Sequence, residues 1–195
     1  MIKDPLALKK FVRTVDNFPI DGIAFRDITS LIETPEAFVK TCDELTKITR
    51  NFGADIVASI ESRGFIFAGT IARDLNLPFV LARKPGKLPN ETYKKSFDLE
   101  YGSTSIEIQK NTEIKSNQKI VIVDDLVATG GTAIACSEIF TENFNVKSEN
   151  ILILSIIDLP ELGGSRLISE KGYLIETLID YWYGIVMNKE YGRLM

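Results

Sequence analysis

The chain has 195 residues, enough for one α/β domain with a sizeable core and too few for two large domains. Its composition, 45% hydrophobic and 26% charged, is that of an ordinary globular protein, and its net charge of -4 argues against a general nucleic-acid or anionic-membrane surface. Histidine is absent, which excludes Ser-His-Asp and Cys-His catalysis and zinc sites built from imidazole.

Targeting and redox signals are also absent from the sequence. The longest apolar runs, residues 64–72 and 151–157, are shorter than the roughly 18–20 residues that cross a membrane. The N-terminus carries charges throughout and lacks the apolar region of a secretory signal. Cys42 and Cys136 have neither the number nor the spacing of a disulfide framework or a metal site. We expect a cytoplasmic protein that binds no nucleic acid and no membrane.

The N-terminal half contains signals for three helices and two strands. Apolar residues recur at helical spacing over residues 4–16, and Pro19 and Gly22 make residues 18–29 a loop or short strand. Thr34 as cap, Pro35 at the first helical position and Gly53 as stop predict a helix between them. Then follow a buried strand (55–60), a helix ending near residue 75 and a strand (78–82).

In the C-terminal half, residues 83–104 are polar, rich in Pro and Gly, and longer than a hairpin turn requires, which predicts a functional or mobile loop. The sequence then predicts strands over 105–109, 119–123, 150–157 and 173–179, with helices over 131–143 and 160–171. This alternation predicts one domain over residues 1–195, built on a mainly parallel sheet with helices on both faces.

The stretch IVIVDDLVATGGTA, residues 120–133, carries the chemistry. It places a Gly-rich turn beyond the carboxyl end of a strand, where ligands of parallel sheets bind. Gly130 and Gly131 let successive amides point inward, the following helix adds its positive end, and Thr129 and Thr132 add hydroxyls. The lysine of the nucleotide-binding P-loop is missing, so γ-phosphate chemistry of that kind is not expected.

Two adjacent carboxylates precede this turn, Asp124 and Asp125. They would repel a phosphate, but they can accept hydrogen bonds from vicinal sugar hydroxyls or from hydrated Mg²⁺. The stretch therefore predicts a socket for a ribose 5-phosphate. The alternative is a Gly-rich turn with a solvated Asp pair that caps a helix; it explains the glycines but not the whole pattern.

The stretch resembles the binding signature of the type I phosphoribosyltransferases. Four further segments resemble the adenine-specific branch of that family: FPIDGIAFRDIT (18–29), ESRGFIFAG (61–69), ARKPGKLPNETY (82–93) and LEYGSTSIEIQ (99–109). The similarity spans about residues 4–179 and implies the type I phosphoribosyltransferase fold. Residues 1–34 would form the N-terminal helix and base-recognition hood, 83–104 a flexible catalytic loop or hairpin, and 180–195 a C-terminal extension.

The resemblance implies transfer of the 5-phosphoribosyl group from 5-phosphoribosyl-1-pyrophosphate (PRPP) to N9 of adenine, giving AMP and pyrophosphate. It implies Mg²⁺ as cofactor, held mainly by PRPP, with water-mediated contacts near Asp124 and Asp125 and no protein metal cage. It also implies a homodimer, which would cover the apolar segment YWYGIVM, residues 181–187. The alternatives are a phosphoribosyltransferase for hypoxanthine, guanine or xanthine, and a non-catalytic regulator that senses PRPP.

The resemblance also assigns residues to the parts of the site. Catalytic roles fall on Glu100, Arg63 and Lys84, and ribose binding on Asp124 and Asp125. The 5-phosphate would be bound by Ala128, Thr129, Gly130, Gly131 and Thr132. Pyrophosphate would be bound by Ser62, Arg63, Lys84, Lys87 and Tyr101. Adenine would be bound by Ala24, Phe25, Arg26 and Leu126.

Physical arguments bear on three of these assignments. Arg63 is a permanent cation at the predicted sheet edge, where a pyrophosphate leaving group needs positive charge. Glu100 would exchange a proton with purine N7, a role open to a carboxylic acid in a chain without histidine; a surface acid is its alternative. Lys84 and Lys87 could instead belong to a solvated run of cations. The strained, often cis, peptide of the family would fall at Glu61–Ser62.

Overall fold

The structure is a computed structural model that describes residues 3–98 and 103–182. Across these residues the core is a five-stranded sheet in the order β4-β3-β7-β8-β9, with every neighbouring pair parallel. The strands are β3 (Ile56–Ile60), β4 (Phe79–Ala82), β7 (Ile120–Val127), β8 (Ile151–Asp158) and β9 (Leu174–Asp180). The predicted parallel α/β architecture is confirmed.

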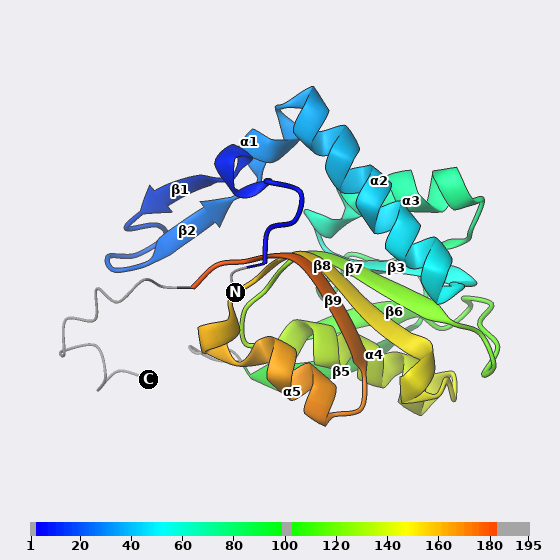
Figure 1. Cartoon of the computed structure of the whole chain (residues 1–195). Helices are drawn as coiled ribbons and strands as arrows, with labels where there is room; N and C mark the ends of the chain where they lie inside the picture. Colours follow the sequence, from blue (N-terminus) through cyan, green and yellow to red (C-terminus); the bar gives the residue numbers. More distant parts are fainter. Residues whose placement is uncertain (1–2, 99–102, 183–195) are drawn as a thin grey trace.

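Helices cover both faces of this sheet (Figure 1). In the view shown, α2 (Pro35–Phe52) and α3 (Gly64–Leu75) lie above it, and α4 (Gly131–Asn143) and α5 (Gly164–Glu170) lie below it. Successive side chains of a strand point to opposite faces. Val121 and Val123 of β7 therefore belong to the apolar layer under α2 and α3, and Ile120 and Ile122 belong to the layer over α4.

The two layers are separate clusters, and each contains one cysteine. Cys42 on α2 is buried in the first layer, and Cys136 on α4 is buried in the second. Burial raises the pKa of Cys42 to about 11 and also raises the pKa of Cys136. Both thiols thus behave as small apolar groups, as the sequence predicts.

Helix α2 has the ends that its sequence predicts, although its cap works differently. It begins at Pro35 and stops at Gly53, where φ is +74°. Thr34 does not cap it, because its hydroxyl donates instead to the carbonyl of Ser30, 2.9 Å away in the short helix α1 (Thr29–Ile32).

The helix predicted over residues 4–16 is wrong. Residues Lys9–Phe11 form a single 3-10 turn, η1, and β1 (Arg13–Asp16) pairs antiparallel with β2 (Ala24–Asp27). The Asp4 carboxylate accepts hydrogen bonds from the amides of Leu8 and Lys9, at 2.7 and 3.2 Å, which favours a turn here. Leu8 and Val12 are buried in this arrangement too, so burial at a spacing of four residues did not require a helix.

The segment predicted as a loop over 83–104 contains a strand. β5 (Thr92–Asp98) pairs antiparallel with β6 (Ser103–Gln109) and lies against α4. The Tyr93 ring meets the Phe144 ring edge-on at 5.3 Å, and the Lys95 ammonium forms ion pairs with Glu138 and Glu142. The loop prediction is therefore correct for residues 83–91 and wrong for 92–98 and 103–104, while residues 99–102 lie outside the described residues.

Of the remaining predictions, the helix over 131–143 matches α4, and the strands and the last helix differ from the structure at their ends. The helix predicted over 160–171 is a 3-10 turn, η3 (Pro160–Leu162), followed by α5; a further 3-10 turn, η2 (Ser148–Asn150), precedes β8. β7 runs to Val127 instead of ending at residue 123, so Asp124 and Asp125 lie on the strand itself. In the part of the chain that the structure describes, no helix is both long and apolar enough to cross a membrane.

Candidate active site

The carboxyl ends of β3 and β7 bring a cation and a carboxylate pair together. A Cβ atom on Gly64 would lie 2.6 Å from Ser59 Oγ and 2.7 Å from the Val123 carbonyl, so only glycine lets α3 start this close to β7. Arg63, one residue earlier, consequently reaches the carboxylates. Its Nε lies 2.9 Å from Asp125 Oδ2 in an ion pair.

The two carboxylates carry electrostatic strain. Asp125 is buried and Asp124 is partly exposed, and the Asp125 amide donates to Asp124 Oδ1 at 2.9 Å. Burial, and then the neighbouring Asp125 charge, raises the pKa of Asp124 well above its usual range. Burial also raises the pKa of Asp125, although the Arg63 guanidinium opposes this. Hydroxyl donors or a cation placed at this edge would relieve the strain.

The predicted phosphate loop closes around a hollow beside this pair. The hollow measures about 100 Å³, and residues 124 and 126–133 line it. Gly130 has a φ of +82° and precedes α4, so the amides of the turn and the start of the helix border the same space. The structure thus brings together all five residues that the sequence assigns to the 5-phosphate.

Of the predicted base-recognition residues, Phe25 lies beside Arg63. Phe25 on β2 has its ring 5.3 Å from the Arg63 guanidinium, and the Phe18 ring meets it edge-on at 5.1 Å. Arg26 points elsewhere: its guanidinium lies 4.5 Å above the Tyr181 ring, and its Nη1 donates to Thr14 Oγ1 at 2.5 Å. Ala24 is partly buried on the same strand, and Leu126 packs against the core from β7.

The root of the 83–87 segment is organised by Glu61, which the sequence did not single out. The Arg83 guanidinium forks onto both Glu61 oxygens at 3.2 Å and donates to the Lys87 carbonyl at 3.0 Å, while the Lys84 amide donates to Glu61 at 3.1 Å. Burial acts to raise the pKa of Glu61, but these hydrogen bonds and charges outweigh it and hold the pKa below its usual value. The sequence signal for this contact was an acid directly after one predicted strand, Glu61 in ESR, and a cation directly after the next, Arg83 in ARK.

Two lysines extend from this root toward solvent. Lys84 and Lys87 are exposed, as is Ser62 beside Arg63. The Glu61–Ser62 peptide is cis. Glu100 and Tyr101, assigned to catalysis and to pyrophosphate binding, lie outside the described residues, at the join between β5 and β6.

Magnesium would find oxygen ligands here but no ready cage. Within residues 3–98 and 103–182, no cluster of three or more His, Cys, Asp or Glu side chains could hold a metal. Asp125 Oδ2 faces Arg63 without an aligned hydrogen bond from these residues, so this edge can accept donors from a ligand or from hydrated Mg²⁺. The donor chemistry fits a cation that arrives with its own phosphate ligands.

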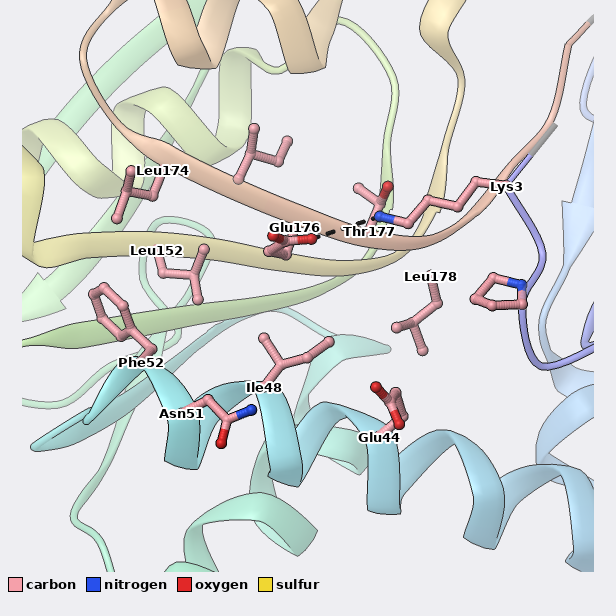
Figure 2. Close-up of a pocket in the computed structure, with 12 residues that line it drawn as sticks. Lys3, Glu44, Ile48, Asn51, Phe52, Leu152, Leu174, Glu176, Thr177 and Leu178 are labelled. Atoms are coloured by element: carbon pink, nitrogen blue, oxygen red, sulfur yellow. Dashed lines mark ion pairs between the residues drawn. The ribbon is translucent and has the colours of Figure 1, made fainter. Parts of the chain in front are cut away.

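A larger hollow lies away from this edge, between α2 and β9, and measures about 510 Å³ (Figure 2). Its walls are mostly apolar, with the Lys3–Glu176 ion pair at 3.5 Å on one side. It contains none of the residues that the sequence assigns to the site. We place the site at the carboxyl edge of the sheet, because cations, carboxylates and loop amides converge there.

Comparison with known proteins shows the family of the chain. A model of the phosphoribosyl transferase domain matches residues 29–170, so the chain belongs to the phosphoribosyl transferase family. The curated adenine phosphoribosyltransferase of Agathobacter rectalis is 42% identical over 174 residues, covering 89% of this chain and 97% of that protein. The one from Novosphingobium aromaticivorans is 44% identical over 175 residues, covering 89% and 96%.

Solved structures give the same result. The adenine phosphoribosyltransferase of Thermoanaerobacter pseudethanolicus superposes with a TM-score of 0.81 at 37% identity, covering 90% of this chain and 98% of that chain. The enzyme of Giardia lamblia, solved in complex with 9-deazaadenine, gives 0.80 at 34% identity, covering 89% and 96%. Within its family, the chain thus groups with the adenine phosphoribosyltransferases.

Proposed function

We propose that this protein transfers the 5-phosphoribosyl group of PRPP to N9 of adenine and releases AMP and pyrophosphate. One observation carries the proposal: Arg63 pairs with Asp125, which adjoins the residues that line the phosphate-loop hollow, and the Arg63 guanidinium lies 5.3 Å from the Phe25 ring. A phosphorylated sugar bound in the loop would have its hydroxyls at the carboxylates and its C1 toward the base-recognition strand. The similar enzymes named above support adenine as the base.

Each group then has a defined task. The loop amides of residues 128–132 bind the 5-phosphate, and Asp124 and Asp125 accept hydrogen bonds from the ribose hydroxyls. Arg63, Lys84 and Lys87, with Ser62 and Tyr101, bind the pyrophosphate as the C1–O bond breaks. The flat slot formed with Phe25 and Leu126 holds the purine, backbone groups of Ala24 and Arg26 read its N6 and N1 edge, and Glu100 exchanges a proton with N7.

Mg²⁺ and pyrophosphate would both interact with the residues around Asp125. When bound, Mg²⁺ supplies positive charge to the pyrophosphate, and Asp124 and Asp125 are the residues that would hold its hydration shell. Incoming pyrophosphate competes with Asp125 for the Arg63 guanidinium, whose Nη atoms extend beyond the Nε that forms the present ion pair.

The direct test is synthesis of AMP from adenine, PRPP and Mg²⁺, run beside identical reactions with hypoxanthine, guanine and xanthine. We expect adenine to be preferred by at least tenfold in kcat/KM. Equal or better use of another purine would refute the adenine assignment, and no nucleotide with any base would refute the reaction.

Variants separate the two halves of the PRPP socket. Thr132→Ala removes one neutral donor among several, so it should weaken PRPP binding by about 1–2 kcal/mol, roughly tenfold, with little change in kcat. Asp124→Asn or Asp125→Asn keeps the size but removes charge near a carbon that becomes positive, so kcat should fall by about 10²-fold. Near-normal turnover in both Asp variants would show that the carboxylates do not face the sugar.

We further propose a homodimer that works in the cytoplasm. The segment of the chain that first suggested a dimer, residues 181–187, lies mostly outside the described residues. An apolar surface at the outer strand β4 supports the dimer instead: Phe79 and Leu81 are each 37% exposed, and the Phe65 ring packs edge-on against Phe79 at 6.1 Å. A second copy of the chain would cover this surface.

A further inference from the structure

The turn that starts α5 touches the phosphate loop, backbone against backbone. The Gly164 amide donates a hydrogen bond of 3.1 Å to the Ala128 carbonyl. At the end of β8, the Leu159 amide donates to the Val127 carbonyl at 3.0 Å. The connection from β8 to α5 is therefore bonded at two points to the connection from β7 to α4, which carries the phosphate loop.

This contact leaves no room for a side chain. A Cβ atom on Gly164 would lie 2.2 Å from the Ala128 carbonyl oxygen, 2.7 Å from the Gly130 nitrogen and 2.8 Å from the Thr129 carbonyl carbon, closer than real Cβ atoms approach. Reciprocally, a Cβ on Gly130 would lie 3.0 Å from the Gly164 carbonyl oxygen. All these neighbours are backbone atoms, which cannot rotate away as the end of a side chain can.

We propose that Gly164 is a positioning residue for the phosphate loop, and that its missing side chain sets where the loop amides point. The inference rests on the proposed function for the nature of the ligand, a sugar 5-phosphate. Amide donors bind phosphate directionally, and displacement of a binding group by about 1 Å can cost about 10²-fold in rate. A methyl group at residue 164 would displace the loop on this scale, because 2.2 Å must widen past 3.0 Å.

The neighbouring glycine provides a matched control. Gly163 has a φ of +74°, and its Cβ would meet only the Arg166 side chain, at 3.5 Å. Gly163→Ala therefore strains the same turn through its backbone conformation without entering the loop. Gly163→Ala strains the turn only through its positive φ, whereas Gly164→Ala adds a methyl group that reaches residues 128–130.

The experiment compares Gly164→Ala with Gly163→Ala, using circular dichroism and Tm to confirm folding. Calorimetric titration with ribose 5-phosphate measures the loop alone, and steady-state kinetics separate KM for PRPP from kcat and from KM for adenine. We expect Gly164→Ala to raise Kd for ribose 5-phosphate and KM for PRPP by about 10- to 100-fold, with KM for adenine within twofold. Gly163→Ala should lower Tm and leave these constants within twofold. Equal losses in both variants, or normal binding by folded Gly164→Ala, would overturn the proposal.

If Gly164→Ala does not fold, hydrogen exchange in the unaltered protein tests the same coupling between Gly164 and the phosphate loop. The Gly164 amide bonds the loop, whereas the Gly172 amide, just past the far end of α5, bonds the Ser169 carbonyl at 2.9 Å. Saturating ribose 5-phosphate should slow hydrogen exchange of the Gly164 amide at least fivefold and leave Gly172 unchanged. Unchanged exchange at Gly164 would refute the coupling. Neither the titration with ribose 5-phosphate nor the hydrogen-exchange measurement uses adenine, so both test the loop even if the unaltered protein makes no AMP.

Discussion

At the scale of single residues, the site is electrostatically costly before any ligand binds. Asp124 and Asp125 lie side by side on β7, and the pKa of each is raised by burial. Arg63 offsets part of this for Asp125 through its ion pair, while Asp124 also feels the negative charge of its neighbour. Such a pair is retained at a functional site because the ligand, not the folded protein, satisfies it.

We therefore predict that Asp124→Asn stabilises the ligand-free protein at pH 7. The pKa of Asp124 is raised in the folded state, so its penalty is absent below its unfolded pKa, near 4, and grows as the pH rises through its folded pKa. The amide removes the penalty and can still accept from the Asp125 amide through its Oδ1. Tm at pH 7 should rise by a few degrees, since 1 kcal/mol corresponds to about 2–4 °C for a domain of this size.

The pH dependence supplies the check on this prediction. Differential scanning calorimetry of both proteins from pH 7 to pH 3 should show the gap in Tm closing as the pH falls, because Asp124 becomes protonated in both states below its unfolded pKa, near 4. A gap that is constant with pH, or lower stability of the variant at pH 7, would contradict the assigned strain.

At the scale of elements, local sequence patterns predicted the strands of the five-stranded sheet and the helices that cover it. They failed for β1 and β5, whose conformation depends on pairing with another strand. Continuous apolar runs such as 151–157 and the Pro35 and Gly53 signals gave strands and helices with ends correct to within a few residues. The N-terminal segment 4–16 has a spacing that suits a helix equally well, and it forms β1 only because β2 pairs with it. In β5, Tyr93 and Phe97 alternate toward the core, but the lysines between them hid the strand period.

The candidate site also has a part that the sequence predicted and a part that it missed. The loop 128–132, Asp124, Asp125 and Arg63 meet as predicted, because strand ends of a parallel sheet share one edge. Glu61, Gly164 and Tyr181 were missed, since each acts on a segment far away in sequence: Glu61 on Arg83, Gly164 on Ala128, Tyr181 on Arg26. The Gly-Gly pair at 163–164, where α5 starts, was visible in the sequence. Nothing near it in the sequence indicates that Gly164 contacts Ala128, in the loop after the adjacent strand β7.

Tyr181, directly after β9, contacts β2, the strand to which we assign base recognition. Its ring contacts the Arg26 guanidinium at 4.5 Å and the Lys9 ammonium at 5.0 Å, and its hydroxyl donates to the Lys9 carbonyl at 3.3 Å. Cation–π contacts are worth about 0.5–2 kcal/mol. We predict that Tyr181→Ala raises KM for adenine by roughly 3- to 10-fold while KM for PRPP stays within twofold.

Tyr181→Phe is the matched variant, because it keeps the ring and loses only the hydroxyl. It should retain KM for adenine within about twofold if stacking is the cause. Steady-state kinetics with each substrate varied in turn gives both constants. Equal rises in both KM values, or a Phe variant as impaired as the Ala variant, would show that the stack does not position β2.

At the scale of the whole molecule, the two outer strands of the sheet differ, which allows the dimer to be tested. Leu81 on β4 and Leu174 on β9 are both exposed leucines, at 37% and 45%, on opposite edges of the sheet. Leu81→Lys should place a charge in the proposed interface and shift a dimer to monomer at micromolar concentration in sedimentation velocity. Leu174→Lys should leave the dimer intact. Dissociation by Leu174→Lys alone would move the interface to β9, and an unaltered protein that sediments as a monomer would remove the dimer.

Each of the two apolar layers contains one cysteine, so thiol labelling can report when each layer opens to solvent. A thiol reacts as its thiolate, so buried Cys42 and Cys136, with their raised pKa values, should be labelled only when their layer is exposed to solvent. Cys42→Ala reports the layer over α4 alone, and Cys136→Ala reports the layer under α2 and α3 alone.

Both layers share the strands β3, β7 and β8, so we predict one cooperative opening with equal protection of the two thiols from a maleimide or disulfide reagent. Rates that differ by more than about tenfold, or roughly 1.4 kcal/mol, would instead reveal a layer that detaches while the sheet persists. In the proposed function, PRPP binds at the carboxyl edge of the sheet, which joins the two layers. PRPP should therefore slow labelling of both cysteines by the same factor. Protection of only one cysteine would show that its layer opens independently of the other.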